Sequence, residues 1–326
     1  MAKKEKSAVG RRGFLKGAAV GAAAIAAGPA GQAQAPTNAP SSRPAALPPT
    51  PAQRAAETSP PAEDIQIVER PGSDYMVDVF NSLGLEYLFA TPGSSFRGIH
   101  ESAINHGGNR PEFITCMHEE CSVAMANGYA KVEGKPVLVC AHGTVGIQHA
   151  AMAIYNAYCD QAPVFIVAGN ISDAAERRGR VEWLHAVQDV GATVREYTKW
   201  DDSPASLTHF GESAVRAYQL AMTPPTMPVL LAADGVLQES PAPTDFDWRI
   251  PKLPRIAAPA GDSTAVAELA RMLVAAENPL FVASRSARTP EGLRLLIELA
   301  ETLQAGVIDQ QRRMNFPGRH PLNQTQ

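Results

Sequence analysis

Short, almost uninterrupted apolar runs alternate with helical segments along the middle of the chain, and this alternation constrains the fold more than any other feature. Five such runs have the length and composition of strands, at 87–90, 112–116, 136–141, 163–168 and 227–232. Strands that are apolar throughout are buried on both faces, as in parallel sheets covered by helices. The sequence therefore predicts an α/β fold, a doubly wound parallel sheet with helices on both faces.

The first 35 residues have the features of an export signal. A basic start precedes Arg11-Arg12-Gly13-Phe14-Leu15-Lys16, and small apolar residues at 17–28 lead to Ala33-Gln34-Ala35. This order is typical of a twin-arginine signal. The alternative, a membrane anchor, needs about 20 apolar residues to cross roughly 30 Å of hydrocarbon, and the alanine- and glycine-rich stretch is too short. We therefore expect a periplasmic protein, exported by the twin-arginine pathway, with no stable membrane insertion.

Composition divides the rest of the chain into further parts. Residues 36–68 are rich in Pro, Ala, Ser and Thr without a periodic apolar face, so we expect a disordered linker. The α/β domain occupies 69–240, and a Pro-rich connector spans 241–260. Residues 261–326 contain about two βα units, an incomplete Rossmann-like domain. Because the chain stops there, we expect a truncated reading frame.

Charge and cysteine content exclude several functions. The net charge is -4, and no basic stripe with interleaved aromatic residues marks a nucleic-acid surface. Four cysteines in 326 residues do not form a disulfide scaffold. A zinc site built from Cys116, His118, Cys121, Cys140 and His142 is a minor alternative, because the spacing fits none of the usual paired templates.

Three loops that follow predicted strands are the candidate sites. Ligands of open parallel sheets bind beyond the carboxyl ends of the strands, where these loops lie at 91–95, 117–120 and 142–146. Glu119 begins a helix, a position that helix-dipole pairing alone explains. Ser94 is by default a helix cap and His142 a structural histidine. Taken singly, these residues leave function open.

The order and spacing of these motifs resemble the N-terminal domain of thiamine-diphosphate enzymes, most closely the benzoylformate decarboxylase and acetolactate synthase relatives. The resemblance rests on a series of motifs in chain order. They are Thr91-Pro92-Gly93-Ser94, the run from His118-Glu119 to Asn127-Gly128-Tyr129-Ala130, His142-Gly143-Thr144-Val145-Gly146, Asn156-Ala157-Tyr158, Pro163, Gly169-Asn170 and Thr198-Lys199-Trp200. It covers about 72–239 well and implies that 69–240 is a pyrimidine-binding domain. Residues 261–326 resemble part of the central domain more loosely.

The resemblance implies a role for each matching residue. The carboxylate at Glu119 hydrogen-bonds a ring nitrogen of the cofactor's aminopyrimidine and favours the tautomer that deprotonates the thiazolium carbon. Ser94 and His142 match residues that face a 2-oxo-acid substrate, with the serine binding its carboxylate and the histidine moving protons. The remaining matches place a further set around the cofactor, namely Pro92, Gly93, Gly143, Thr144 and Gly146.

The resemblance also implies parts that this sequence does not contain. The family binds magnesium and the diphosphate through a Gly-Asp-Gly element in a C-terminal domain, and no Gly-Asp-Gly occurs here. Its sites form between two chains, so we expect a homodimer or homotetramer, or a separate chain supplying the diphosphate domain. The predicted function is a 2-oxo-acid decarboxylase or carboligase, and the alternatives are a truncated non-catalytic remnant of the same fold and, less favoured, a metal-binding protein.

Overall fold

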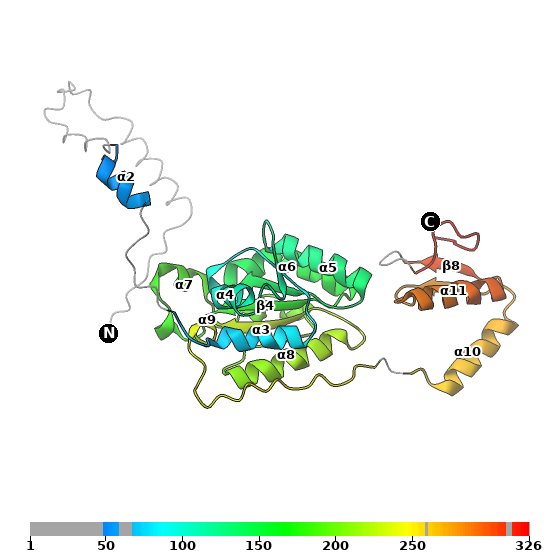
Figure 1. The fold of residues 1–326 in the computed structure, drawn as a ribbon. Helices are drawn as coiled ribbons and strands as arrows, with labels where there is room; N and C mark the ends of the chain where they lie inside the picture. Colours follow the sequence, from blue (N-terminus) through cyan, green and yellow to red (C-terminus); the bar gives the residue numbers. More distant parts are fainter. Residues whose placement is uncertain (1–47, 59–66, 258–259, 311–314, 326) are drawn as a thin grey trace, which may run out of the picture. The chain divides into compact units, whose positions relative to one another are not determined.

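The computed structural model of the protein describes residues 48–58, 67–257, 260–310 and 315–325 (Figure 1). The described residues divide into two units, with the boundary after residue 65. The expected export signal lies outside the described residues. Part of the expected linker is described and contains helix α2 (Pro51–Thr58), which its composition did not predict. Within the described ranges, no helix is both long enough and apolar enough to cross a membrane.

The second unit is built on a six-stranded sheet in the order β2-β1-β3-β4-β6-β5, with every neighbouring pair parallel. The strands are β1 (Tyr87–Ala90), β2 (Glu112–Thr115), β3 (Leu138–His142), β4 (Phe165–Asn170), β5 (Trp200–Asp202) and β6 (Val229–Asp234). Five of them fall on the predicted apolar runs. The sequence did not predict β5, because this edge strand is short and carries two aspartates.

Helices cover both faces of the sheet (Figure 1). One face packs against α3 (Gly72–Ser82), α4 (Arg97–Asn105) and α8 (Leu207–Met222). The other packs against α5 (Glu119–Glu133) and α6 (Thr144–Asp160). The remaining helical elements of this domain are η1 (Ser94–Phe96), η2 (Ala174–Glu176), α7 (Gly179–His185), η3 (Gly191–Thr193), η4 (Arg195–Tyr197) and α9 (Gly235–Glu239).

Alternate residues of each central strand enter opposite cores. In β3, Leu138 and Cys140 pack in the core under α3 and α8, whereas Val139 and Ala141 pack under α5 and α6. Successive strand side chains point to opposite faces, so a strand in this position must be apolar at every residue. The predicted doubly wound α/β fold is confirmed.

Local signals explain several helix ends. Ser206 caps α8 by accepting a hydrogen bond from His209 N at 3.1 Å, and Gly134 ends α5 in the left-handed region with φ 70°. Ser73, which lies at the predicted start of α3, does not cap it. Pro71 is the N-cap, and the Ser73 hydroxyl lies 2.7 Å from the Ser102 hydroxyl between two packed helices.

The C-terminal residues form α10 (Ser263–Ala275), β7 (Leu280–Ala283), α11 (Pro290–Leu303) and β8 (Gly306–Asp309). The two strands pair in parallel, with Phe281 opposite Val307. Parallel pairing through a helical crossover makes this a βαβ unit, preceded by a further helix. The sequence predicted these elements within about two residues at each end.

Strand order identifies the place where a ligand crevice forms. The chain runs from β1 outward to β2 on one side, and then returns to β3 on the other side of β1. Doubly wound sheets bind ligands at this reversal, beyond the carboxyl ends of the strands. The loops that follow β1 and β3 therefore meet where a site is expected.

Candidate active site at the carboxyl edge of the sheet

The loops after β1 and β3 are joined by a direct side-chain contact. His142 ends β3, and its Nδ1 lies 3.0 Å from the Oγ of Ser95 in η1. Gly93 is required here, because a Cβ at that position would overlap the His142 ring. The ring also lies edge-on to Phe96, with 6.0 Å between the ring centroids. The turn after β1 thus holds the imidazole from two sides.

Backbone contacts fix the position of Ser95. Gln238 of α9 is almost fully buried, and its Nε2 donates to the Ser95 carbonyl at 3.1 Å and to the Ala233 carbonyl at 3.0 Å. Gly169 of β4 lies against the same Ser95 carbonyl, where any side chain would overlap it. A residue near the C-terminal end of the domain therefore positions a loop near its start.

A second histidine lies beside His142. His185 ends α7, and its ring centroid is 4.8 Å from that of His142. Burial lowers the pKa of His142 below its ordinary value, and His185 lowers this pKa further, while Glu119 acts in the opposite direction. Nδ1 of His185 is buried and has no hydrogen-bond partner among the described residues. Two imidazoles, one of them biased toward its neutral form, thus face each other.

Glu119 lies on the other side of His142, in the first turn of α5. Its side chain is 7% exposed, and Oε2 lies 3.3 Å from Nδ1 of His149 on α6. Gly146 makes room for it, because a Cβ on Gly146 would lie 2.8 Å from Glu119 Oε1 and 2.9 Å from His142 Cβ. The carboxylate and the imidazole therefore flank one glycine of α6, and the position of Glu119 at a helix N-terminus favours the charged carboxylate.

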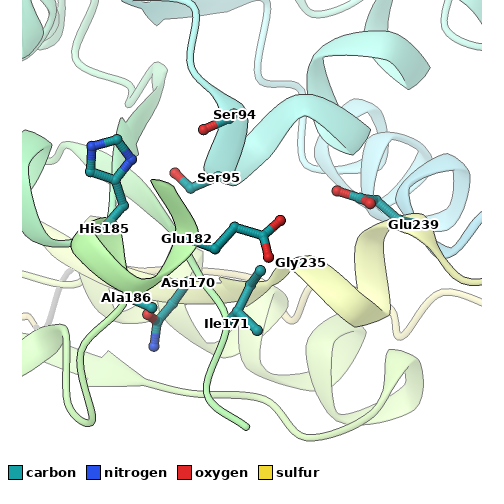
Figure 2. A pocket seen from close by; sticks show the side chains of 9 residues that line it. All are labelled: Ser94, Ser95, Asn170, Ile171, Glu182, His185, Ala186, Gly235 and Glu239. Carbon is teal, nitrogen blue, oxygen red and sulfur yellow. The ribbon is translucent and has the colours of Figure 1, made fainter. Parts of the chain in front are cut away.

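A pocket opens beside the serines of η1 (Figure 2). Figure 2 shows the His185 ring and the Ser94 and Ser95 hydroxyls on one side and the Glu239 carboxylate on the other. The sequence-predicted Ser94 is exposed at this pocket, whereas His142 does not line it and stands behind Ser95. The lining residues are Ser94, Ser95, Asn170, Ile171, Glu182, His185, Ala186, Gly235 and Glu239.

Two arginines neutralise the charges of the two carboxylates that line the pocket. Glu239 of α9 pairs with Arg97 at 2.6 Å and with Arg178 at 2.7 Å. Glu182 of α7 pairs with Arg97 at 3.5 Å and with Arg178 at 3.9 Å. Asn170 adds two uncharged hydrogen bonds. Its side chain donates to the Val187 carbonyl at 3.0 Å and accepts from the Val187 N–H at 3.2 Å. These contacts hold α7 and the residues after it against the carboxyl edge of the sheet.

The structure separates the predicted site residues into groups. Glu119, His142 and Gly146 come together, and Ser94 lies at the neighbouring pocket. Gly143 and Thr144 face the α7 end, where Thr144 Oγ1 donates to the His185 carbonyl at 2.8 Å and a Cβ on Gly143 would lie 3.1 Å from the same oxygen.

Pro92 is exposed at the turn. Sequence reasoning did not single out four residues that the structure adds to the site, namely Ser95, His149, His185 and Gln238.

The positions of the cysteines do not form a zinc site among the described residues. Cys140 is fully buried in the core under α3 and α8, and burial raises the pKa of its thiol. The Cys121 Sγ lies 3.5 Å from Nε2 of His118, a contact between the first turn of α5 and its N-cap residue. Across the described ranges, no three His, Cys, Asp or Glu side chains are arranged to hold a metal ion. The metal-binding alternative therefore has no geometric support in this part of the chain.

The fold and site are those of an α/β domain with a buried carboxylate near the reversal of strand order, where doubly wound sheets bind ligands. Comparison with known families identifies the domain more closely. Residues 70–190 match the family described as "Thiamine pyrophosphate enzyme, N-terminal TPP binding domain". This match, together with the relatives below, confirms the resemblance recognised from the sequence motifs.

Individual relatives agree with the family assignment. Benzoylformate decarboxylase of Pseudomonas aeruginosa is 28% identical over 249 residues, covering 74% of this chain and 45% of that protein. Acetolactate synthase of Bacillus subtilis is 22% identical over 249 residues, covering 76% and 42%.

The crystal structure of benzoylformate decarboxylase from Polynucleobacter necessarius matches with a TM-score of 0.65 and 25% identity over 78% of this chain and 46% of that one. The chain thus spans a little under half the length of the curated relatives it matches.

Proposed function

We propose that this chain supplies the aminopyrimidine-binding part of a thiamine-diphosphate-dependent 2-oxo-acid decarboxylase or carboligase. One observation carries the proposal, the burial of Glu119 at the carboxyl edge of the sheet with its Oε1 next to Gly146. The relatives' names support the substrate class, because benzoylformate is a 2-oxo acid and acetolactate synthase forms a carbon–carbon bond.

The residues present fit the aminopyrimidine. Only glycine at position 146 leaves room for the carboxylate, since a Cβ there would lie 2.8 Å from Oε1. The other oxygen of Glu119 contacts His149, which is 58% exposed and so open to displacement. In a poorly solvated cleft, a hydrogen bond from this carboxyl group to a ring nitrogen meets little competition from water.

The residues of the site then take separate tasks. When bound, thiamine diphosphate supplies the carbon nucleophile and the electron sink for loss of carbon dioxide. Glu119 holds a proton at the pyrimidine ring and does not touch the substrate. Burial lowers the pKa of His142 and favours its neutral imidazole, which can exchange a proton with the pocket through the Ser95 hydroxyl. Ser94 presents its hydroxyl at the pocket, where it binds the substrate carboxylate.

The proposal includes a partner and a location. Apolar side chains remain exposed on and before α5 and α6, including Met117 at 87%, Met125 at 44%, Met152 at 61% and Tyr155 at 48%. Exposed apolar groups on neighbouring helices are typical of surfaces that another chain covers. A second copy, or a separate chain carrying the diphosphate domain with Mg²⁺, would complete the site. The twin-arginine motif supports export of the assembled protein to the periplasm.

Hydrogen exchange at the thiazolium carbon tests the proposal. The protein is purified with any chain that co-purifies, loaded with thiamine diphosphate and Mg²⁺, and its C2–H exchange is followed by acid-quench NMR. Glu119→Gln is expected to slow exchange roughly 10²- to 10⁴-fold, the usual range for loss of a positioned acid or base.

Glu120→Gln is the matched control, because it removes a carboxylate from the same helical turn. The control should leave exchange unchanged. Exchange at the wild-type rate in Glu119→Gln would reject the assigned role.

A further inference from the structure

The hydroxyl that faces both the pocket and the imidazole belongs to Ser95. Ser95 lines the pocket together with Ser94 and His185, while His142 lies behind it. Ser95 is not the N-cap of η1, which is Gly93. Its contact in the fold is instead Nδ1 of His142 at 3.0 Å. The hydroxyl therefore connects an imidazole to the pocket.

The direction of this hydrogen bond determines what the pocket binds. A serine hydroxyl has one proton and two acceptor lone pairs. If Nδ1–H of His142 donates to Oγ, the Ser95 proton is directed to another acceptor, and the pocket lies on that side. The Nδ1–H of His142 and the O–H of Ser95 then form a chain of two hydrogen bonds that is directed toward the pocket. An acceptor in the pocket, above all an anionic oxygen, receives a stronger hydrogen bond from such a chain.

We propose that Ser95 is a substrate-binding residue of this site, which accepts a hydrogen bond from Nδ1–H of His142 and donates its own proton to an oxygen of an anionic substrate. The substrate class, a 2-oxo acid, rests on the proposed function above. His185 stands beside the same position with a buried Nδ1 that lacks a partner among the described residues, which supplies a second polar atom for the same ligand.

The charges around the pocket are compatible with an anion. The carboxylates of Glu182 and Glu239 line it, and each is paired with both Arg97 and Arg178. The charged or titratable groups that act on the His142 imidazole are Glu119 and His185. Glu119 lies across Gly146 from the imidazole and is not among the pocket-lining residues. An anion in the pocket therefore meets the Ser95 hydroxyl and carboxylates that are each paired with arginine.

Histidine tautomers give the first test, on the purified protein without cofactor. The protein is labelled with ¹⁵N-histidine, the His142 signals are assigned with His142→Asn, and spectra are recorded well above the ordinary imidazole pKa of about 6.5. The wild-type protein is expected to show the Nδ1–H tautomer of His142. Ser95→Ala removes the acceptor and should shift the population toward Nε2–H, whereas Ser95→Thr, which keeps a hydroxyl, should retain Nδ1–H. An Nε2–H tautomer in the wild type overturns the proposal.

Ligand binding gives the second test, with benzoylformate as the probe and the same NMR signals as the readout. Benzoylformate should shift the His142 and His185 signals, and Ser95→Ala should weaken its binding roughly 10- to 100-fold, as for loss of a hydrogen bond to a charged group. Ser203→Ala is the control, because Ser203 is exposed after β5. Equal affinity in wild type and Ser95→Ala overturns the proposal.

No cofactor takes part in either measurement, so both succeed or fail independently of the Glu119→Gln exchange experiment.

Discussion

Two sides of Gly146 are built in different ways. The carboxylate side consists of Glu119 with His149, and these residues come from α5 and α6, two helices joined by one strand. The imidazole side consists of Ser95, His142 and His185, which come from the turn after β1, the end of β3 and the end of α7. Glu119 and His142 both lie close to Gly146. Only the carboxylate side, however, comes from helices that are adjacent in the chain order.

The difference predicts how each side responds to change. The position of Glu119 follows from where α5 begins, so it depends on the local sequence and on the space above Gly146. The position of Ser95 depends on Gln238, which lies 143 residues further along the chain. Contacts of this separation form only when the whole domain is folded. We therefore expect the imidazole side to be the more sensitive to distant substitutions.

Gly146→Ala should have the largest effect, because it damages both sides at once. The new Cβ would lie 2.8 Å from Glu119 Oε1 and 2.9 Å from His142 Cβ, so one or both side chains must move. Overpacking of this kind costs about 1–3 kcal/mol of unfolding free energy. Chemical denaturation measures this cost, and calorimetry with thiamine diphosphate should show weakened binding.

Gly128→Ala provides the matched control for this variant. Gly128 lies in the middle of α5 and is exposed, with no atom within 4 Å of the added Cβ. Alanine in an exposed helix interior should stabilise the protein by about 0.5–1 kcal/mol. If Gly146→Ala were as stable as Gly128→Ala and bound cofactor normally, Glu119 and His142 would not share the space that the geometry gives them.

Gln238→Leu should affect the imidazole side alone. It removes two hydrogen bonds to the carbonyls of Ser95 and Ala233 and one from the Ile99 N–H, at 3.1, 3.0 and 3.4 Å. Buried groups left without partners make the expected loss about 2 kcal/mol of unfolding free energy. Because Glu119 makes none of these contacts, C2–H exchange should change far less than in Glu119→Gln.

Gln188→Leu changes an exposed glutamine and should leave stability nearly unaltered. Equal loss of exchange in Gln238→Leu and Glu119→Gln would show that the two sides are not separable.

The sequence predicted the parts of this molecule that local pattern determines. Continuous apolar runs identified five of the six strands of the large sheet, and the beginning of α5 placed Glu119 in a helical first turn. The edge strand β5 was missed, because only one face of its Trp200-Asp201-Asp202 segment packs against the domain's core. Propensity alone does not identify an edge strand that tertiary pairing creates.

The imidazole side shows what the sequence could not provide. Ser94 and Ser95 are identical neighbours, and only the geometry of η1 decides which hydroxyl reaches His142. His185 carried no local signal, since it approaches His142 through the packing of α7 on the carboxyl edge of the sheet. Gln238 would pass as an ordinary helix residue. Contacts between segments so far apart are properties of the folded domain and have no counterpart in a sequence window.

The smallest predicted effect concerns the charge of His142. Burial and His185 lower its pKa, so the unfolded chain binds a proton that the folded chain does not bind near the ordinary imidazole value. Stability therefore rises with pH through this window and is lost as the pH falls below it. An NMR titration should place the His142 midpoint below about 6.5. His185→Asn removes one of the two causes and should move the midpoint upward, while His209→Asn, on the exposed side of α8, should not. A wild-type midpoint at or above the ordinary value would show that neither burial nor His185 lowers the pKa of His142.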